Sequence, residues 1–436
     1  MSTVLSTPTR TFEERAPAVP ASGLIGPNGS QAELGAHLAA HGRLPDLSPR
    51  QIIELASGSG LTGHGGAGFP LWRKLQAVAD AGRRPIVVAN GAEGEPASAK
   101  DRWLLANRPH LVLDGLQLAA RAVGAREAVL YAGERQPLHQ LEQILRQRRG
   151  SLRHGGERVP VDLVSAPEAF ISGEESAVVN YLTSGYVLPR LKIPRVTERG
   201  VRGRPTLVSN VETLALLALI ARRGAAWFRA SGTADEPGTM LCTVTGAVQR
   251  PGIVEVAYGT PLVDVVAAAG GPTTPPAAVL LGGYHGSWLT AAEASGARLS
   301  RADLAALGAS PGAGVVVVLP EGTCGLAEVS RVMTYLARES AGQCGPCLNG
   351  LPRIAEHVRS LAVSGRDHRA VEELQRLSGV VAGRGVCHHP DGSVRFLRGA
   401  LRVFADEVRL HRSGRCSARA ALGAAPWVLP VPGRRV

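Results

Sequence analysis

The most informative segment of the first half of the chain is Gly58-Ser-Gly-Leu-Thr-Gly-His-Gly-Gly-Ala-Gly68-Phe-Pro70. So many glycines in a short segment disfavour helix and strand, because each glycine loses much backbone entropy when it is ordered. Such a loop lets backbone N–H groups approach an anion closely. We therefore predict an anion-binding loop, and a plain flexible loop is the alternative. Lys74 follows a few residues later.

The sequence after this loop alternates between apolar runs and segments with helical spacing. Strands are expected at 85–90, 127–132 and 159–164, and helices at 49–56, 103–123, 139–149, 174–182 and 210–222. Alternation of this kind predicts an α/β layered domain, here over residues 46–230. Residues 1–45 are predicted to form an extended N-terminal arm.

Three more polar turns stand out in the sequence: Asn90 to Pro96, Phe170 to Ser176, and Gly203 to Thr213. The first follows an expected strand at its carboxyl end, where ligands bind in open α/β sheets, and the second lies between a strand region and a helix. Asn210 can also be read as a helix N-cap, which is its structural alternative.

The second half of the chain divides at a linker over residues 231–238. Apolar runs at 240–246 and 253–256 flank Arg250-Pro-Gly252, a typical hairpin sequence, which predicts a small α+β unit over 238–322. Helical spacing then dominates 325–410, and 411–436 is predicted to be a loose tail.

The cysteines are clustered only in part. Cys344-Gly-Pro-Cys347 places two thiols on one turn, and Cys387 can complete a face from another segment. This set is compatible with zinc, an iron–sulfur centre or a redox dithiol. Cys324 and Cys416 are scattered, and Cys242 is expected in the core of a strand.

Composition excludes several classes of protein. The net charge of +12 comes from 48 Lys and Arg in 436 residues, but only Lys74, Lys100 and Lys192 are lysines. Without a basic run, and with 4% aromatic residues, a nucleic-acid binder is not favoured. No apolar run is long enough to span a membrane, and no signal pattern is visible, so a cytoplasmic location is expected.

Together these motifs resemble the 51-kDa type (F-type) flavoprotein of NADH–quinone oxidoreductase (complex I), as a divergent paralogue. The family's G-R-G-G-A-G-F-P corresponds to Gly63–Pro70, and its lysine to Lys74. Its N-A-D-E-x-E-P-G-x-F-K-D-R, G-E-E-T-A and G-x-P-T-x-V-N-N-V-E-T correspond to Asn90–Arg102, Gly173–Ala177 and Gly203–Thr213. The order is kept over about residues 50–410.

The resemblance implies an FMN-binding α/β layered domain, then a ubiquitin-like β-grasp domain, then an α-helical iron–sulfur bundle. It implies hydride transfer from NAD(P)H to FMN, with electrons leaving through a [4Fe–4S] cluster. The flavin carries the chemistry, so no catalytic side chain is assigned. Implied partners are a ferredoxin or [2Fe–2S] subunit, or a membrane-associated reductase that would make the chain peripheral to a membrane.

Site residues follow from the matched motifs. Cys344, Cys347 and Cys387 are the implied cluster ligands. The implied cofactor-binding residues are Gly63, Gly65, Gly66, Gly68, Phe69, Lys74, Asn90, Glu93, Glu95, Phe170, Gly173, Glu174, Glu175, Val208, Ser209, Asn210 and Thr213.

Several positions depart from the family pattern. Ala341 stands where the family has its first cluster cysteine, and Ala77 stands at a family aromatic associated with the NADH adenine. Ala99, Ala92 and His64 replace a second aromatic, an Asp and an Arg. The alternative function is thus a non-oxidising flavin-binding or structural paralogue, with a zinc-filled or empty cysteine site. The candidates for a fourth cluster ligand are Ser340, His388, His389, Cys324, Cys416 or water.

Overall fold

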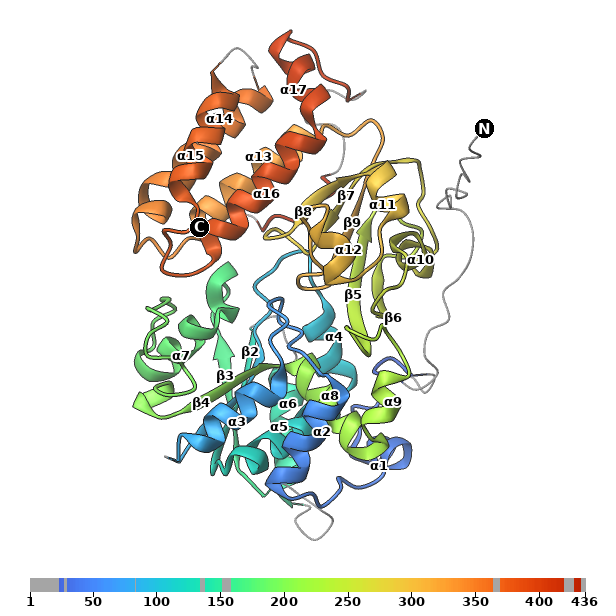
Figure 1. The fold of residues 1–436 in the computed structure, drawn as a ribbon, viewed down its shortest axis with the longest axis vertical. Coiled ribbons are helices and arrows are strands. Elements are labelled where there is room, and N and C mark those ends of the chain that lie inside the picture. The colour runs from blue at the N-terminus through green and yellow to red at the C-terminus, as the bar shows by residue number, and fades with distance from the viewer. Residues whose placement is uncertain are drawn as a thin grey trace, which may run out of the picture.

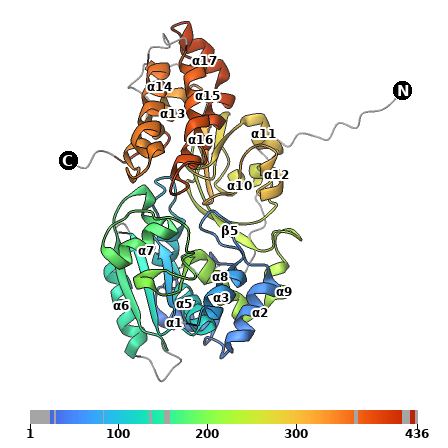
Figure 2. The same ribbon diagram turned by 60° about the vertical axis from the view of Figure 1, so that its left-hand side comes forward.

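The computed structural model describes residues 23–26, 30–82, 84–133, 138–150, 158–363, 369–418 and 427–432. They form three units: an α/β domain, a smaller sheet domain beside it, and a bundle of helices at the far end of the molecule (Figure 1). Turning the molecule shows the helical bundle standing above α7 and beside the sheet domain (Figure 2).

The first domain is built on a four-stranded parallel sheet in the order β3-β2-β1-β4. Its strands are β1 (Ile86–Gly91), β2 (Glu127–Gly133), β3 (Val161–Ala166) and β4 (Thr206–Asn210). Strand β4 corrects the sequence analysis, which placed these residues in a polar turn. Its apolar signal is only Leu207 and Val208, and it is a strand because it pairs with β1 along its whole length.

Alternating side chains of the sheet enter two different cores. Val87 and Ala89 face a large cluster with α5 (Pro109–Val123) and α8 (Val211–Arg223), whereas Ile86 and Val88 face α7 (Glu175–Ser184). This period of two is what a sheet covered on both faces requires. The remaining helices are α1 (Leu34–His41), α2 (Pro49–Ser59), α3 (Leu71–Asp80), α4 (Lys100–Asn107), α6 (Leu138–Gly150) and α9 (Ala225–Arg229), with short turns at Phe170–Gly173 and Val201–Gly203.

The predictions for one helix and for the N-terminal arm need correction. The segment 103–123 is not one helix, because the chain breaks at Arg108, where Pro109 lacks an N–H and disfavours helical dihedrals in the preceding residue. The predicted extended arm contains α1, which docks on α5 through a 2.9 Å contact between His37 Nε2 and Asp114 Oδ2. Residues 1–22 and 27–29 of that arm lie outside the described residues.

The second domain is a five-stranded sheet in the order β6-β5-β9-β7-β8. The two central strands β5 and β9 are parallel and the other pairs are antiparallel, which is the β-grasp arrangement and confirms that prediction. The strands are β5 (Thr239–Gly246), β6 (Gly252–Ala257), β7 (Pro276–Leu281), β8 (Ser287–Thr290) and β9 (Val315–Pro320), with helices α10 (Leu262–Ala268), α11 (Ala291–Gly296) and α12 (Arg301–Ala305).

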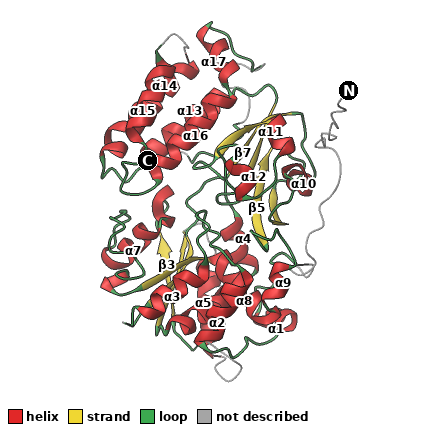
Figure 3. Cartoon of the chain, viewed as in Figure 1, coloured by secondary structure: helices red, strands yellow, loops and turns green. Residues whose placement is uncertain are grey.

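The third domain is wholly helical in its described part (Figure 3). Its helices are α13 (Gly325–Arg338), α14 (Leu351–Val363), α15 (Ala370–Val381), α16 (His389–Val403) and α17 (Ala405–Arg412), with a π-helical turn at Pro346–Gly350. No helix of the described chain combines the length and apolarity that crossing a membrane needs.

The predicted loose tail is ordered where it is described. Val428 and Leu429 donate their backbone N–H groups to the Glu328 carboxylate on α13, and Leu429 is buried. A short sequence rich in Pro therefore docks because a buried carboxylate accepts its amides.

Candidate functional site

The carboxyl ends of the four parallel strands meet at one edge of the sheet, and three of the predicted motifs follow them there. The glycine loop joins the same edge from the α2–α3 connection. Its ends are held together by the Gly63 N–H donating to the Phe69 carbonyl at 2.9 Å. The His64 N–H donates to Thr213 Oγ1 at 2.9 Å, which ties the loop to the start of α8.

The loop has room for a ligand at some positions and none at others. At Gly63 and Gly65 a Cβ would make only ordinary contacts, with Phe69 and Asn210 respectively. Gly68 has a φ of +64° and packs against the Arg301 guanidinium of the β-grasp domain. No signal in the sequence pointed to Arg301. Phe69 is about half exposed, so the loop leaves an aromatic ring at the surface.

Lys74 places a partly exposed cation at this edge. Its Nζ donates to Glu175 Oε1 at 2.7 Å and to the Val208 carbonyl at 3.3 Å. Both side chains of the pair remain partly exposed. The structure thus brings together three predicted residues, Lys74 of α3, Glu175 of α7 and Val208 of β4. The buried Ser209 follows Val208.

The turn from Asn90 to Pro96 is held by its own side chains. Asn90 Nδ2 donates to the Gly173 carbonyl at 2.9 Å, and Glu93 accepts the backbone N–H groups of Asp101 and Arg102 at the start of α4. Glu95 accepts the Tyr284 N–H at 2.7 Å, and burial raises its pKa to about 7. Glu93 and Glu95 therefore already have partners that position the turn.

Glu174 and Asn210 cap helices. Glu174 Oε2 accepts the Ala177 N–H at 2.9 Å at the start of α7. Asn210 Oδ1 accepts the Glu212 N–H at 3.0 Å, which is the structural role anticipated for it, and its Nδ2 donates to Asp101. Both caps aim the first turns of their helices, and so their N–H groups, at the shared edge.

A buried cluster of charged side chains lies below this edge, and the sequence analysis did not predict it. Lys100 Nζ lies 2.7 Å from Asp101 Oδ1 and 2.9 Å from Glu212 Oε2. Glu212 Oε1 accepts the Leu241 N–H at the start of β5, so the cluster joins the first two domains. The one indication in the sequence is that lysine is rare in this chain. This rarity draws attention to Lys100 but does not reveal its partners.

His64 is a structural residue in this arrangement. It is 5% exposed, and its two ring nitrogens lie 2.9 Å from the Thr62 carbonyl and 3.1 Å from the Thr239 carbonyl. Burial lowers its pKa, although Glu212 opposes this. The ring thus braces the glycine loop against the β-grasp domain.

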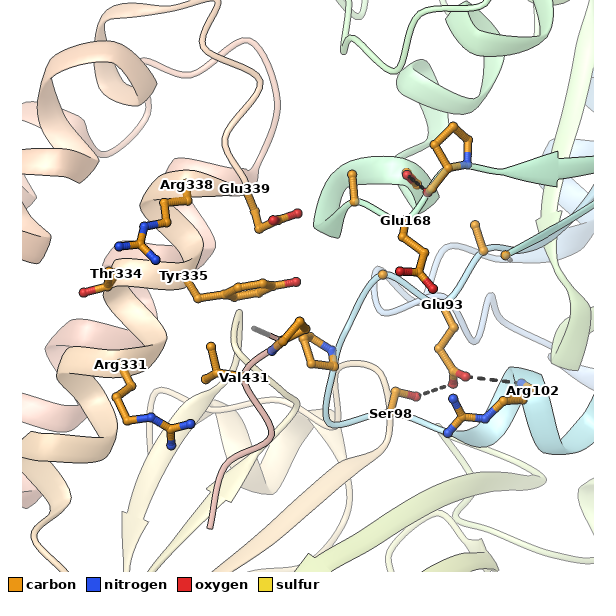
Figure 4. A pocket seen from close by; sticks show the side chains of 18 of the residues that line it. Glu93, Ser98, Arg102, Glu168, Arg331, Thr334, Tyr335, Arg338, Glu339 and Val431 are labelled. Atoms are coloured by element: carbon orange, nitrogen blue, oxygen red, sulfur yellow. Dashed lines mark hydrogen bonds between the residues drawn. The ribbon is translucent and has the colours of Figure 1, made fainter. Parts of the chain in front are cut away.

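A cavity of about 580 Å³ lies at the carboxyl ends of β1, β2 and β3, between the Ala92–Ser98 turn and α13 (Figure 4). Arg331, Arg338 and Glu339 reach it from the α13 side. Of the predicted cofactor residues, only Glu93 lines it. The cavity therefore lies at the carboxyl edge of the sheet, but Lys74 is not among the residues that line it.

An aromatic junction of Phe170, His285, Tyr335 and His389 joins all three domains. Phe170 lies 4.6 Å from the His285 ring and 5.5 Å from the His389 ring, between centroids. The Phe170 N–H donates to Glu339 Oε2 at 3.0 Å, just before the cysteine loop. The junction therefore links the sheet edge to the segment that carries Cys344.

The structure brings Cys344, Cys347 and Cys387 together. Burial raises the pKa of Cys347 to about 12, and its neighbour Cys344 adds to the rise. The pKa of Cys387 is also raised, chiefly by burial and further by Glu174, the N-cap of α7, and by Cys344. The Ser340 hydroxyl lies within hydrogen-bonding reach of Cys347, so three thiols and a hydroxyl are a donor set that fits an iron–sulfur cluster.

The structure removes three candidates for the fourth ligand. Cys324 begins α13, whose 14 residues span about 20 Å, so it lies far from the loop after that helix. Cys416 lies beside Cys324, with the two sulfur atoms within 4.8 Å of each other, so it is equally far from that loop. His389 is engaged by His285 and the Leu336 carbonyl, whereas His388 is exposed, next to Cys387 in the chain. Ser340, His388 and water remain.

Comparison with known proteins agrees with this geometry. Residues 56–218 match the Nuo51 FMN-binding domain, residues 241–283 the SLBB domain, and residues 327–411 the NADH-ubiquinone oxidoreductase-F iron-sulfur binding region. The second F-type subunit of NADH-quinone oxidoreductase in Rhizobium meliloti (strain 1021) is 33% identical over 389 residues, covering 86% of this chain and 92% of the relative. The corresponding protein of Rickettsia bellii (strain OSU 85-389) is 29% identical over 372 residues, covering 82% and 89%.

Solved structures give the same result. A chain of the NAD⁺-reducing [NiFe]-hydrogenase in its H₂-reduced state superposes with a TM-score of 0.78 and 34% identity over 84% of this chain. The air-oxidised state gives a TM-score of 0.77, with 31% identity over 94% of this chain and 67% of that one. In the first comparison the chain spans 63% of the hydrogenase chain.

An α/β domain for FMN, a β-grasp domain and a cysteine-bearing helical domain, in this order, define a flavoprotein with an iron–sulfur-binding region. The glycine loop and Lys74 supply N–H groups and a cation, so the residues present fit the FMN phosphate. The chain belongs to the family of F-type subunits of NADH-quinone oxidoreductase.

Proposed function

We propose that this chain oxidises NAD(P)H at FMN and passes the electrons through an iron–sulfur cluster to a partner. Two contacts at one edge of the sheet support the proposal. Lys74 is bonded to Glu175 beside the glycine loop. At the same edge, the Phe170 N–H donates to Glu339, which precedes the cysteine loop. Bound FMN would supply hydride acceptance and one-electron release. The protein would supply position and electrostatics.

The predicted cofactor residues take distinct parts in this proposal. Gly65 and Gly66 would present N–H groups to the phosphate, and Lys74 would add a positive charge. The Gly63 N–H would keep the loop closed through its bond to the Phe69 carbonyl. Glu175 would hold Lys74 in place when no ligand is bound, as its 2.7 Å contact indicates. Asn90, Glu93, Glu95, Gly173 and Glu174 would act by fixing the turns around the flavin.

The proposed partners are a ferredoxin or [2Fe–2S] subunit, or a membrane-associated reductase, and the proposed location is cytoplasmic. The related F-type subunits and the hydrogenase chain are named as parts of larger enzymes, which supports a partner for this chain. A non-oxidising paralogue is the second candidate, and Ala341 favours it because one family cluster ligand is absent.

Anaerobic purification followed by flavin, iron and sulfide analysis tests the proposal. We expect one FMN per chain, an iron–sulfur absorption envelope, and bleaching of the flavin band on addition of NADH or NADPH. A flavin spectrum that neither nucleotide bleaches would overturn the enzymatic proposal and support the non-oxidising paralogue. A colourless protein would overturn the enzymatic proposal and support a structural paralogue with a zinc-filled or empty cysteine site.

A further inference from the structure

A second group of metal-binding side chains lies at the opposite end of α13 from the predicted cluster. Cys324 is the N-cap of α13, Glu407 and His411 are one turn apart on α17, and Cys416 follows that helix. The ligand atoms of all four residues lie within 4.8 Å of one another. Three of the four residues are buried, and Cys416 is exposed.

The spacing of these atoms suits one small ion. Around tetrahedral zinc, with Zn–S near 2.3 Å and Zn–N near 2.0 Å, a sulfur and a nitrogen ligand are about 3.5 Å apart. Cys324 Sγ and His411 Nε2 are 3.4 Å apart, and His411 Nε2 and Glu407 Oε1 are 3.0 Å apart. A [4Fe–4S] core would stand between its ligands and hold them farther apart, so this group does not suit a cluster.

The surroundings hold the ligands in place. The Ser417 N–H donates to Glu407 Oε1 at 3.0 Å, which fixes the carboxylate beside His411. Two sulfurs, an imidazole and a carboxylate are a donor set for Zn²⁺, which accepts soft and hard ligands in tetrahedral geometry.

We propose that Cys324, Glu407, His411 and Cys416 bind one Zn²⁺ in a closed structural site. The ion would tie the start of α13 to the end of α17 and to the chain beyond it. It is separate from the iron–sulfur centre, and it does not depend on the proposed oxidation of NAD(P)H.

Metal analysis of the full-length protein, purified without chelator, tests the site. We expect one zinc per chain, lost in Cys416→Ser and in His411→Gln, and kept in the matched control His139→Gln on the exposed face of α6. In Cys344→Ser we expect the iron content to fall and the zinc content to stay. Zinc that persists in Cys416→Ser and His411→Gln but disappears in Cys344→Ser would place the ion at the other cysteines and overturn the proposal.

Cobalt provides a second readout, which in the wild-type protein needs no variant. Protein loaded with Co²⁺ is expected to show a thiolate-to-cobalt charge-transfer band and the strong visible bands of a tetrahedral ion. Cys416→Ser should weaken the charge-transfer band while His139→Gln leaves it unchanged. Wild-type protein that binds neither ion, or that carries a Cys324–Cys416 disulfide by peptide mass spectrometry after anaerobic preparation, would overturn the proposal.

Discussion

Lys74 and Glu175 form an ion pair of 2.7 Å that joins α3 to α7 across the carboxyl edge of the parallel sheet. Because both side chains are partly exposed, the pair contributes at most about 1 kcal/mol to stability. Its position at the edge where the glycine loop, β4 and α7 meet fits the proposal that Lys74 binds a ligand there.

Replacement of Lys74 should therefore affect FMN more than folding. We expect Lys74→Gln to weaken FMN binding by about 1.5–3 kcal/mol, roughly tenfold to a hundredfold, because it removes a charged donor to a phosphate. Fluorescence titration of apoprotein with FMN measures this change. The neighbouring exposed cation offers a matched control, Arg73→Gln, which should bind FMN normally. Equal affinities in the two variants would argue against a role for Lys74.

Substitution of Gly65 tests whether the glycine is needed for ligand binding or for folding. A Cβ at this position would meet only Asn210 Cβ, at 3.5 Å, so Gly65→Ala should leave the thermal midpoint of the apoprotein nearly unchanged. If the loop holds the FMN phosphate closely, the methyl group should reduce flavin content sharply. Gly68→Ala, where φ is +64° and Arg301 blocks the site, should lower the midpoint as well. Full flavin occupancy in Gly65→Ala would contradict the proposed phosphate site.

The sequence was sufficient for the parts of the fold that local pattern specifies. The strands near Ile86 and Glu127 are apolar runs, and the glycine loop is unmistakable by composition. Strand β4 could not be recognised in this way, because its apolar pair is short and its identity comes from pairing with β1. Local pattern does not identify a strand that tertiary pairing creates.

The same limit applies to the sites. Motif order predicted that Cys344, Cys347 and Cys387 would meet. Cys324 and Cys416 looked scattered, since their approach depends on α17 packing against α13 and not on any spacing in the chain. The caps made by Glu93 and Glu174 were also hidden, because a sequence does not show whether a carboxylate faces a ligand or a helix N-terminus.

Restoring the family ligand should strengthen the cluster site. Ala341 lies in the loop between α13 and Cys344, beside Ser340, whose hydroxyl reaches Cys347. We expect Ala341→Cys to raise iron and sulfide per chain and to slow cluster loss in air, because a thiolate is a better iron ligand than a hydroxyl or water. Gln343→Cys adds a thiol to the same loop at a different position and should bring no such gain. Equal iron content in the two variants would show that a fourth cysteine is not what limits the cluster.

Glu95 should make stability depend on pH in a direction unusual for a carboxyl group. Burial raises its pKa from 4.5 to about 7, while the N–H groups of Tyr284 and Ala97 act in the opposite direction. The folded protein then binds this proton more tightly than the unfolded chain, so stability present at low pH is lost as pH rises from about 4.5 to 7. A shift of this size corresponds to about 3 kcal/mol at full effect. Removing the titration with Glu95→Gln should raise the thermal midpoint at pH 7.5 relative to wild type more than it does at pH 5.

The thermal midpoint of the variant must be compared with that of the wild type at each pH. Other buried groups titrate in both proteins, so their effects cancel in this difference. Glu142→Gln, on the exposed face of α6, should leave the difference between pH 5 and pH 7.5 at its wild-type value. If Glu95→Gln shifts the midpoint equally at both pH values, Glu95 is ionised in the folded protein throughout this range. Its hydrogen bonds to the Tyr284 and Ala97 amides would then outweigh its burial, and the contact between the first two domains would gain from the charge instead of losing by it.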